Sequence, residues 1–280
     1  MQKKDIIDQL FDLSGRVAVI TGGAGLLGFQ HAKAIAACGG TTVLLDVNID
    51  QATTRAKEIA DTFQTPSLGL KVDITNKPEI QKSLSQILET FGRVDILINN
   101  AANDPKVKNE PNEKPWSRFE DFSRETWDQD IAVGLTGAML CSQVFGAQMA
   151  KNKSGVILNV ASDLGVVAPD QRIYRQPNTP DDMQPVKPVT YSVVKHGLIG
   201  LTKYLAAYWN EQGVRVNAIS PGGVYNNQPQ EFVDRLTPLI PLERMANLDE
   251  YQAAVVYLVS DASSYMTGAN LNIDGGRTCR

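Results

Sequence analysis

A glycine-rich turn between a short apolar strand and a helix is the stretch that most constrains this fold. Residues 16–28 read RVAVITGGAGLLG. The four apolar residues at 17–20 predict a short buried strand, and apolar or small residues at helical spacing predict a helix over 26–38. Strand, glycine turn and helix form the unit that holds a dinucleotide, because glycine lets a phosphate approach the backbone and the first helical amides face it. On its own, such a loop is also compatible with an ordinary tight turn.

A dinucleotide site also needs an acid at the end of the next strand, and the next predicted strand has one. It covers 41–46, reads TTVLLD and ends in Asp46, 18 residues after Gly28. A carboxylate there would bond the adenosine ribose hydroxyls and repel a 2′-phosphate, and no arginine follows it directly. The sequence therefore favours NAD over NADP as the cofactor. The alternative is that Asp46 is a plain turn residue.

Composition and charge exclude several classes of function. With 280 residues, 42% hydrophobic residues and a formal charge of −4, the chain is expected to be a soluble globule that does not bind nucleic acid. No apolar run approaches the ~20 residues of a membrane span, and residues 1–10 lack an apolar signal region. We therefore expect no membrane association and a cytoplasmic location. Three cysteines without pairing or metal spacing and two histidines in helical patterns predict no metal site; they are Cys38, Cys141, Cys279, His31 and His196.

Short apolar strands alternate with helices along the whole chain. This alternation predicts an α/β fold with a parallel sheet that helices cover on both faces. No internal repeat or linker divides the chain, so residues 1–280 are expected to form a single domain. Further strands are expected at 68–73, 94–98, 155–161, 214–219 and 270–273, and further helices at 50–63, 77–91, 124–151, 191–212 and 249–260.

Polar residues follow several of these strands, at the carboxyl ends where a parallel sheet binds its ligands. Asp73 and Asn100 are therefore expected to line one crevice together with Asp46. Ser162 lies just past the fifth strand, at the same edge of the predicted sheet.

Tyr191 and Lys195 form the pair that could carry chemistry. On a helix, residues four apart share a face, so the lysine ammonium can lie near the phenol oxygen. A free phenol has a pKa of about 10, and the lysine charge with the positive charge of an oxidised nicotinamide would lower that pKa toward neutrality. Tyr191 would then be the general base for an alcohol that loses a hydride, and the acid in the reverse direction. Ser162, 29 residues earlier, could hold the substrate oxygen, although a Tyr–Lys pair at this spacing also arises by chance on a surface.

The order of these motifs resembles that of a short-chain dehydrogenase/reductase of the compact single-domain type, over about residues 15–276. The resemblance implies a single-domain Rossmann fold with a doubly wound sheet of seven parallel strands. It also implies that Ser162, Tyr191 and Lys195 are catalytic, and that the helices beginning near Arg124 and Tyr191 build homodimer or homotetramer contacts. The residues that it assigns to the cofactor are Gly22, Gly25, Leu27, Gly28, Asp46, Asp73, Ile74, Asn100, Ala101, Tyr191, Lys195, Pro221, Gly222 and Val224.

Several features depart from the usual pattern of that family. Leu26 stands where the compact subgroup usually has glycine, and Ala102 replaces the glycine that usually ends Asn-Asn-Ala-Gly. Gly134 stands where the family has an asparagine that helps hold a water in a proton relay from the lysine, which implies a substitute relay or slower chemistry. The 29 residues between Ser162 and Tyr191 indicate a long substrate loop, because family members often have about a dozen there.

Two charged, proline-containing segments at about 103–121 and 166–190 are expected to be the substrate loops. Their basic residues hint at an anionic or phosphorylated substrate, but solvated loop charges offset by the neighbouring Asp170, Asp181 and Asp182 are the favoured interpretation. These basic residues are Lys106, Lys108, Arg172, Arg175 and Lys187.

The long loop and the sequence ISPGG at 219–223 also resemble family members from bacterial surface-sugar and flagellin-glycosylation pathways, and gluconate- and polyol-oxidising members. The prediction is an NAD-dependent oxidoreductase for a secondary alcohol or ketone of a sugar or sugar derivative. Two alternatives remain open: a carbonyl reductase for an apolar, lipid-like substrate, and a dinucleotide-sensing protein without turnover. The polar loops weigh against the first, and the intact Ser162, Tyr191 and Lys195 weigh against the second.

Overall fold

Seven parallel strands form one central sheet in the computed structural model, which describes residues 3–103 and 114–279. The strand order is β3-β2-β1-β4-β5-β6-β7, so the sheet grows outward from β1 in one direction and from β4 in the other. The expected fold class, a doubly wound parallel sheet of seven strands, is confirmed. The strands are β1 (Val17–Thr21), β2 (Thr41–Asp46), β3 (Ser67–Lys71), β4 (Ile96–Asn99), β5 (Gly155–Val160), β6 (Val214–Pro221) and β7 (Asn270–Ile273).

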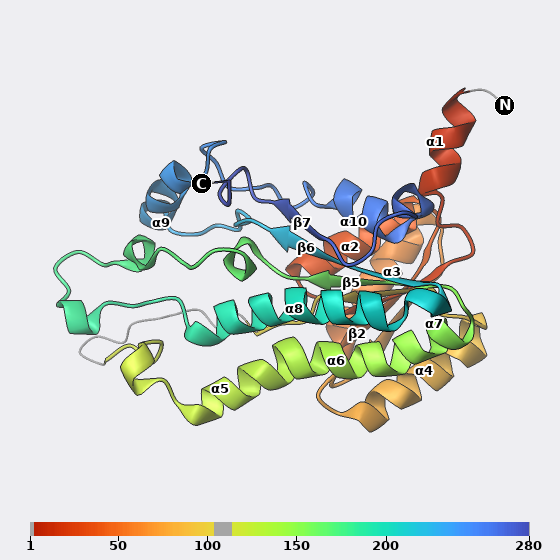
Figure 1. Cartoon of the computed structure of the whole chain (residues 1–280), viewed down its shortest axis with the longest axis horizontal. Coiled ribbons are helices and arrows are strands. Elements are labelled where there is room, and N and C mark those ends of the chain that lie inside the picture. The colour runs from red at the N-terminus through yellow and green to blue at the C-terminus, as the bar shows by residue number, and fades with distance from the viewer. Residues whose placement is uncertain (1–2, 104–113, 280) are drawn as a thin grey trace.

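Helices cover both faces of this sheet (Figure 1). On one face, α2, α3 and α10 enclose a core that includes Phe29 and Tyr251. On the other face, α4, α8 and the segment α5–α7 enclose a core that includes Phe145 and Trp209. Because both faces are buried, the central strands are continuous apolar runs rather than alternating ones. The helices are α2 (Leu26–Ala37), α3 (Ile49–Phe63), α4 (Lys77–Phe91), α5 (Arg124–Ile131), α6 (Gly137–Cys141), α7 (Ala147–Lys151), α8 (Val189–Tyr208) and α10 (Gln252–Val259).

One long helix runs from Arg124 to Lys151, as the sequence predicts. Its parts α5, α6 and α7 are joined by two π-helical turns, Ala132–Thr136 and Ser142–Gly146. By length and composition alone this helix could cross a membrane, but half of its most apolar window is buried inside the protein. A core helix passes the same test, so this composition is only a weak indication of a membrane span.

Two helices lie outside the predicted elements. At the N-terminus, α1 (Lys3–Phe11) stands away from the body of the fold (Figure 1) and leaves Ile6 and Ile7 exposed. Near the C-terminus, α9 (Gln230–Leu236) packs through Leu236 on the buried Ile173 of the second substrate loop. With 9 and 7 residues, both helices are too short for an apolar period to reveal them in the sequence.

Candidate active site

The glycine turn after β1 forms a cradle that side chains would fill. Gly22 has a φ of +58°, a conformation that glycine adopts without strain. A Cβ on Gly28 would lie 2.2 Å from the carbonyl oxygen of Gly22, so the helix can approach the turn only with glycine there. Gly25 caps α2 without any side-chain hydrogen bond, and Leu27 lies in the first turn of that helix. A bare helix N-terminus beside a glycine backbone fits a pyrophosphate, as the sequence predicts.

Asn100 holds this turn against the end of β4. Its Nδ2 donates to the carbonyls of Thr21 at 3.0 Å and Gly22 at 3.2 Å. In return, the Thr21 hydroxyl accepts from the backbone amides of Asn100 and Ala101 at 3.0 and 3.1 Å. Asn100 and Ala101 therefore shape the cradle as well as bordering it.

Asp46 lies beside the same turn, at the end of β2. One carboxylate oxygen accepts from the Ala24 amide at 3.2 Å, and the other accepts from the Asn48 amide at 3.1 Å. The carboxylate is partly exposed next to the glycine cradle. A ribose attached to a pyrophosphate in that cradle would lie within its reach.

Asp73 and Ile74 follow β3, which ends at Lys71 and not at Asp73 as predicted. The Asp73 carboxylate accepts from the Thr75 amide and hydroxyl at 2.9 and 2.7 Å, and this local turn replaces further strand pairing. Ile74 is buried, and its Cδ1 would lie 2.6 Å from a Cβ on Gly137 of the long helix. Both side chains are thus engaged by the protein, and their contact with an adenine stays a prediction.

The loop after β6 is fixed by the C-terminal part of the chain. Pro221 pairs with Ile273 of β7, and the Gly222 amide donates to the Ile273 carbonyl at 2.9 Å. The Tyr251 hydroxyl donates to the Gly222 carbonyl at 3.1 Å, and burial raises the pKa of this phenol, which keeps the donor protonated. Val224 forms a further β-bridge. The segment predicted to seat the nicotinamide is therefore held at several points.

Ser162, Tyr191 and Lys195 meet at the carboxyl end of β5. The Tyr191 hydroxyl lies 3.5 Å from Ser162 Oγ, and Lys195 Nζ lies 5.7 Å from the centroid of the Tyr191 ring. Lys195 is buried and donates at 2.8 Å to the carbonyl of Val160, the last residue of β5. The buried Ser162 hydroxyl donates to Asp163 Oδ1 at 2.8 Å. The structure thus brings the three residues predicted as catalytic together.

A buried row of amides and hydroxyls fixes these strand ends to the helices. Asn99 Nδ2 donates to Asn159 Oδ1 at 2.8 Å and to Ser142 Oγ at 3.1 Å. Asn159 Nδ2 donates in turn to Thr202 Oγ1 at 2.8 Å. The row links β4, β5, the long helix and α8, so the strand that leads to the serine and the helix that carries the tyrosine keep one relative position.

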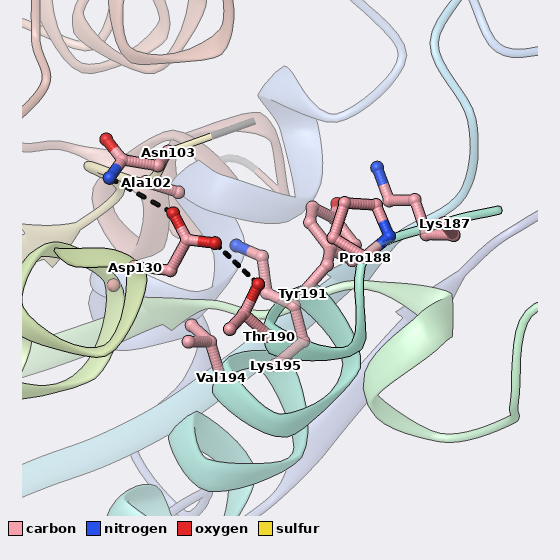
Figure 2. Close-up of a pocket in the computed structure, with 10 residues that line it drawn as sticks. Ala102, Asn103, Asp130, Lys187, Pro188, Thr190, Tyr191, Val194 and Lys195 are labelled. Atoms are coloured by element: carbon pink, nitrogen blue, oxygen red, sulfur yellow. Dashed lines mark hydrogen bonds between the residues drawn. The ribbon is translucent and has the colours of Figure 1, made fainter. Parts of the chain in front are cut away.

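A cavity of about 10 Å³ lies beside Tyr191 and Lys195 (Figure 2), and this is about the space that one water centre needs. Asp130 of α5 is the only acid among the described residues that line it. One of its carboxylate oxygens accepts from the Thr190 hydroxyl at 2.5 Å, and the other accepts from Asn103 Nδ2 at 3.3 Å. The remaining lining residues are Ala102, Gly134, Lys187, Pro188 and Val194.

Gly134 and Val194 pack closely against each other beside this cavity. A Cβ on Gly134 would lie 2.6 Å from Val194 Cγ1, and Val194 is buried. A side chain as large as asparagine therefore fits at position 134 only if the valine moves. The departure from the family pattern at Gly134 is thus part of the packing of α8 on the long helix.

The two predicted substrate loops lie together where the structure describes them. Arg118 Nη1 donates to the Asp181 carbonyl at 2.8 Å, and the Val186 amide donates to the buried Ser117 hydroxyl at 3.3 Å. The long segment between Ser162 and Tyr191 is therefore anchored to the end of the first loop.

The basic residues of these loops have different surroundings. Lys187 lines the cavity, and its Nζ lies 3.8 Å from the centroid of the Tyr191 ring. Arg172 is exposed and pairs with Asp170 at 2.6 Å, as expected for an offset surface charge. The Arg175 side chain is also exposed. Lys106 and Lys108 lie outside the described residues.

Sequence reasoning missed three residues with direct contacts to the site. Asp130 contacts Thr190, which precedes Tyr191 in the chain. Asp163 follows Ser162 and holds its hydroxyl, and Arg277 near the C-terminus pairs with Asp163. An acid just before the apolar part of the long helix, and an acid directly after a strand-end serine, were the available signals.

Comparisons with known proteins agree with this geometry. A family model for short chain dehydrogenases matches residues 16–174, and one described as enoyl-(acyl carrier protein) reductase matches residues 182–278. A D-threitol dehydrogenase from Mycolicibacterium smegmatis is 33% identical over 279 residues, which cover 98% of this chain and 97% of that protein. An NAD-dependent glycerol dehydrogenase from Listeria innocua is 32% identical over 279 residues, 98% of each chain. The crystal structure of a gluconate 5-dehydrogenase from Burkholderia cenocepacia with NADP and tartrate is 25% identical, with a TM-score of 0.83 over 98% of this chain and 99% of that one.

Proposed function

Because the chain belongs to the short-chain dehydrogenase family, which consists of dinucleotide-dependent oxidoreductases, we propose that it uses NAD to oxidise a secondary hydroxyl of a polyol or sugar derivative. The observation that carries this proposal is the convergence of Ser162, Tyr191 and Lys195 beside the glycine cradle. The reverse reaction, reduction of the corresponding ketone, uses the same residues.

Tyr191 acts as the general base in the oxidation. Its oxygen takes the proton of the substrate hydroxyl, while Ser162 Oγ, 3.5 Å away, bonds the same substrate oxygen. The buried ammonium of Lys195 favours the phenolate form of Tyr191. A bound nicotinamide would supply the acceptor for the hydride of the carbon that bears the hydroxyl.

Asp46 supports NAD as the cofactor. Its partly exposed carboxylate lies beside the glycine cradle, where it would bond ribose hydroxyls and repel a 2′-phosphate. The relatives do not decide the question, because one is named as NAD-dependent and another was solved with NADP.

The polar groups around the reacting pair support a polar substrate. Asn103, Asp130 and Lys187 lie beside Tyr191 and Lys195, and a substrate with several hydroxyls could exchange hydrogen bonds with them, whereas a lipid-like substrate could not. The relatives named for threitol, glycerol and gluconate oxidation act on small polyhydroxylated molecules. Lys187, 3.8 Å from the Tyr191 ring centroid, would also attract the carboxylate of a sugar acid.

The first test is calorimetric titration of the protein with NAD and NADP, followed by a screen of polyols and sugar acids for absorbance of the reduced cofactor. Tyr191→Phe should lower kcat by about 100-fold or more and keep NAD binding, because only proton transfer is lost. Tyr265→Phe, which changes a fully exposed tyrosine outside the site, is the matched control and should leave kcat unchanged. NAD binding without turnover on any polyol would instead support a dinucleotide sensor. Binding of neither dinucleotide would refute the proposal.

We also propose a homodimer or homotetramer, built through α8 and the long helix, and a cytoplasmic location. Tyr204 and Tyr208 are 63% and 61% exposed on α8 and stack on each other with ring centroids 5.8 Å apart. An exposed aromatic patch supports a contact with a second copy. Three free cysteines support a reducing compartment.

A further inference from the structure

We propose that Asp130 carries the substrate's proton from the cavity beside Tyr191 and Lys195 to solvent. The inference rests on the proposed function, because it assigns a proton exit to the same reaction. Asp130 lies on α5, only 8% exposed, and its carboxylate borders the same small cavity as the phenol and the ammonium (Figure 2).

The contacts of Asp130 connect the inside of the site to its outside. The inner oxygen accepts at 2.5 Å from the hydroxyl of Thr190, which is buried and directly precedes Tyr191. The outer oxygen accepts at 3.3 Å from the side chain of Asn103, which is exposed. The Asp130 carboxylate thus bonds the helix that carries Tyr191 through one oxygen and an exposed side chain through the other.

A buried carboxylate is costly unless it is paired or used. No ion pair between described residues includes Asp130, whereas the buried Asp163 is paired with Arg277. The titratable groups that line the cavity with Asp130 are Lys187, Tyr191 and Lys195. Ionisable groups gathered in one small cavity are typical of sites that move protons.

Among the described residues that line the cavity, the long helix offers no side-chain acceptor besides Asp130. Gly134, one turn after Asp130, has no side chain, and the apolar Val194 fills the space beside it. The backbone between them is π-helical from Ala132, a distortion that is frequent at functional sites. Asp130 is therefore the polar group that this helix presents to the cavity.

The proton balance of the oxidation is as follows. The C–H electron pair of the substrate leaves with its hydrogen as hydride, and the O–H electron pair forms the second bond of the carbonyl. The hydroxyl proton passes to the oxygen of Tyr191. From there it crosses the cavity, which has room for one water, to the carboxylate of Asp130. Asp130 releases it to solvent on the side of Asn103, so one proton leaves for each hydride transferred.

The test compares Asp130→Asn, Asp130→Ala and Asp130→Glu with the wild type in the presence of NAD and a polyol that the wild type oxidises. Asp130→Asn keeps an acceptor for Thr190 but cannot take up a proton. Asp128→Asn is the matched control, because Asp128 lies on the same helix, is exposed and bonds Arg124 at the surface.

We expect Asp130→Asn to lower kcat by about 10-fold or more, with KM and NAD affinity changed by less than about twofold. The solvent deuterium isotope effect on kcat should rise, because proton release then limits turnover. Formate should restore activity to Asp130→Ala in proportion to its concentration, and Asp130→Glu and Asp128→Asn should keep most of the activity. A structural role would predict neither the isotope effect nor the rescue.

The proposal is overturned if Asp130→Asn keeps its kcat, or loses it with no change in isotope effect and no rescue of Asp130→Ala by formate. If the wild type oxidises no polyol, the proposed function has failed, and Asp130 is then tested without turnover. After a pH jump with NAD bound, the phenolate absorbance of Tyr191, taken as the difference from Tyr191→Phe, should rise more slowly in Asp130→Asn. Equal rates would overturn the proposal.

Discussion

Arg277 donates to the carboxylate of Asp163 at 2.7 Å, and both side chains of this ion pair are buried. Asp163 also accepts the hydroxyl of Ser162 at 2.8 Å, so the pair joins the C-terminal segment to the strand-end serine. The guanidinium neutralises a carboxylate that would otherwise be buried alone next to the site. The position of the Ser162 hydroxyl therefore depends on Arg277, which lies 114 positions after Asp163 in the sequence.

Arg277→Met should lower the free energy of unfolding by about 3–5 kcal/mol, because it leaves the Asp163 charge buried without a partner. Urea denaturation followed by circular dichroism measures this change. The control is Arg172→Met, which breaks an exposed pair with Asp170 and should change the same free energy by less than about 1 kcal/mol. If both variants lose the same free energy of unfolding, the buried ion pair stabilises the protein no more than the exposed one, and the prediction is wrong.

Gly134→Ala should destabilise the protein by about 1–3 kcal/mol, because the added Cβ would lie 2.6 Å from Val194 Cγ1. The double variant Gly134→Ala/Val194→Ala should recover part of the loss, which thermal or urea unfolding of the four proteins would reveal as a coupling energy. Gly200→Ala on α8 is the matched control, since no atom lies within 4 Å of its Cβ. It should stabilise the helix by up to about 1 kcal/mol. Additive losses at positions 134 and 194 would contradict the complementary packing.

The parts of the fold that follow from periodicity could be predicted from the sequence. The strands β2 and β7 have their predicted bounds. In β2 the reason is a buried apolar run that ends sharply at the polar Asp46. The residues after the strand ends, such as Asn100 and Ser162, lie at one edge of the sheet because all seven strands are parallel. The approach of Tyr191 to Lys195 follows from helical spacing alone.

Contacts between distant segments could not be predicted in this way. Asp130 and Thr190 are 60 positions apart, and their hydrogen bond depends on how α5 packs against α8. The end of β3 could not be predicted either. The Asp73 carboxylate accepts from the Thr75 amide in a local turn, and β3 ends at Lys71, before that turn. The order of motifs therefore predicted that Ser162, Tyr191 and Lys195 lie together, but not the groups that hold and connect them.

Asp46→Ser should shift cofactor preference from NAD toward NADP. The variant removes the charge that would repel a 2′-phosphate, and it also removes the acceptor for ribose hydroxyls and for the Ala24 amide. We expect NAD affinity to fall on the order of tenfold, about 1.4 kcal/mol, and NADP affinity to rise, both measured by calorimetry. Asp50→Ser, an exposed acid in the first turn of α3, is the control and should leave both affinities unchanged. An unaltered ratio of the two affinities in Asp46→Ser would remove the basis for preferring NAD.

His31 should make the protein less stable as the pH falls below neutrality. The side chain is fully buried in α2, neither ring nitrogen has a hydrogen-bond partner among the described residues, and burial lowers its pKa from 6.5 to about 4. The unfolded chain takes up the proton near pH 6.5 and the folded chain does so only near pH 4, so the folded state loses stability across this interval. Protonation of His31 should lower the free energy of unfolding by about 3 kcal/mol once the pH has fallen to about 4. Above pH 7 it should not lower this free energy.

The measurement is the free energy of unfolding in urea at pH 7 and at pH 4.5, for the wild type and for His31→Leu. The leucine variant should lose clearly less stability between the two pH values, because it has no group to protonate in the unfolded state. His196→Gln, which removes the exposed histidine on α8, should keep the wild-type difference. If His31→Leu shows the same loss as the wild type, the acid sensitivity does not arise from His31 and the prediction is wrong.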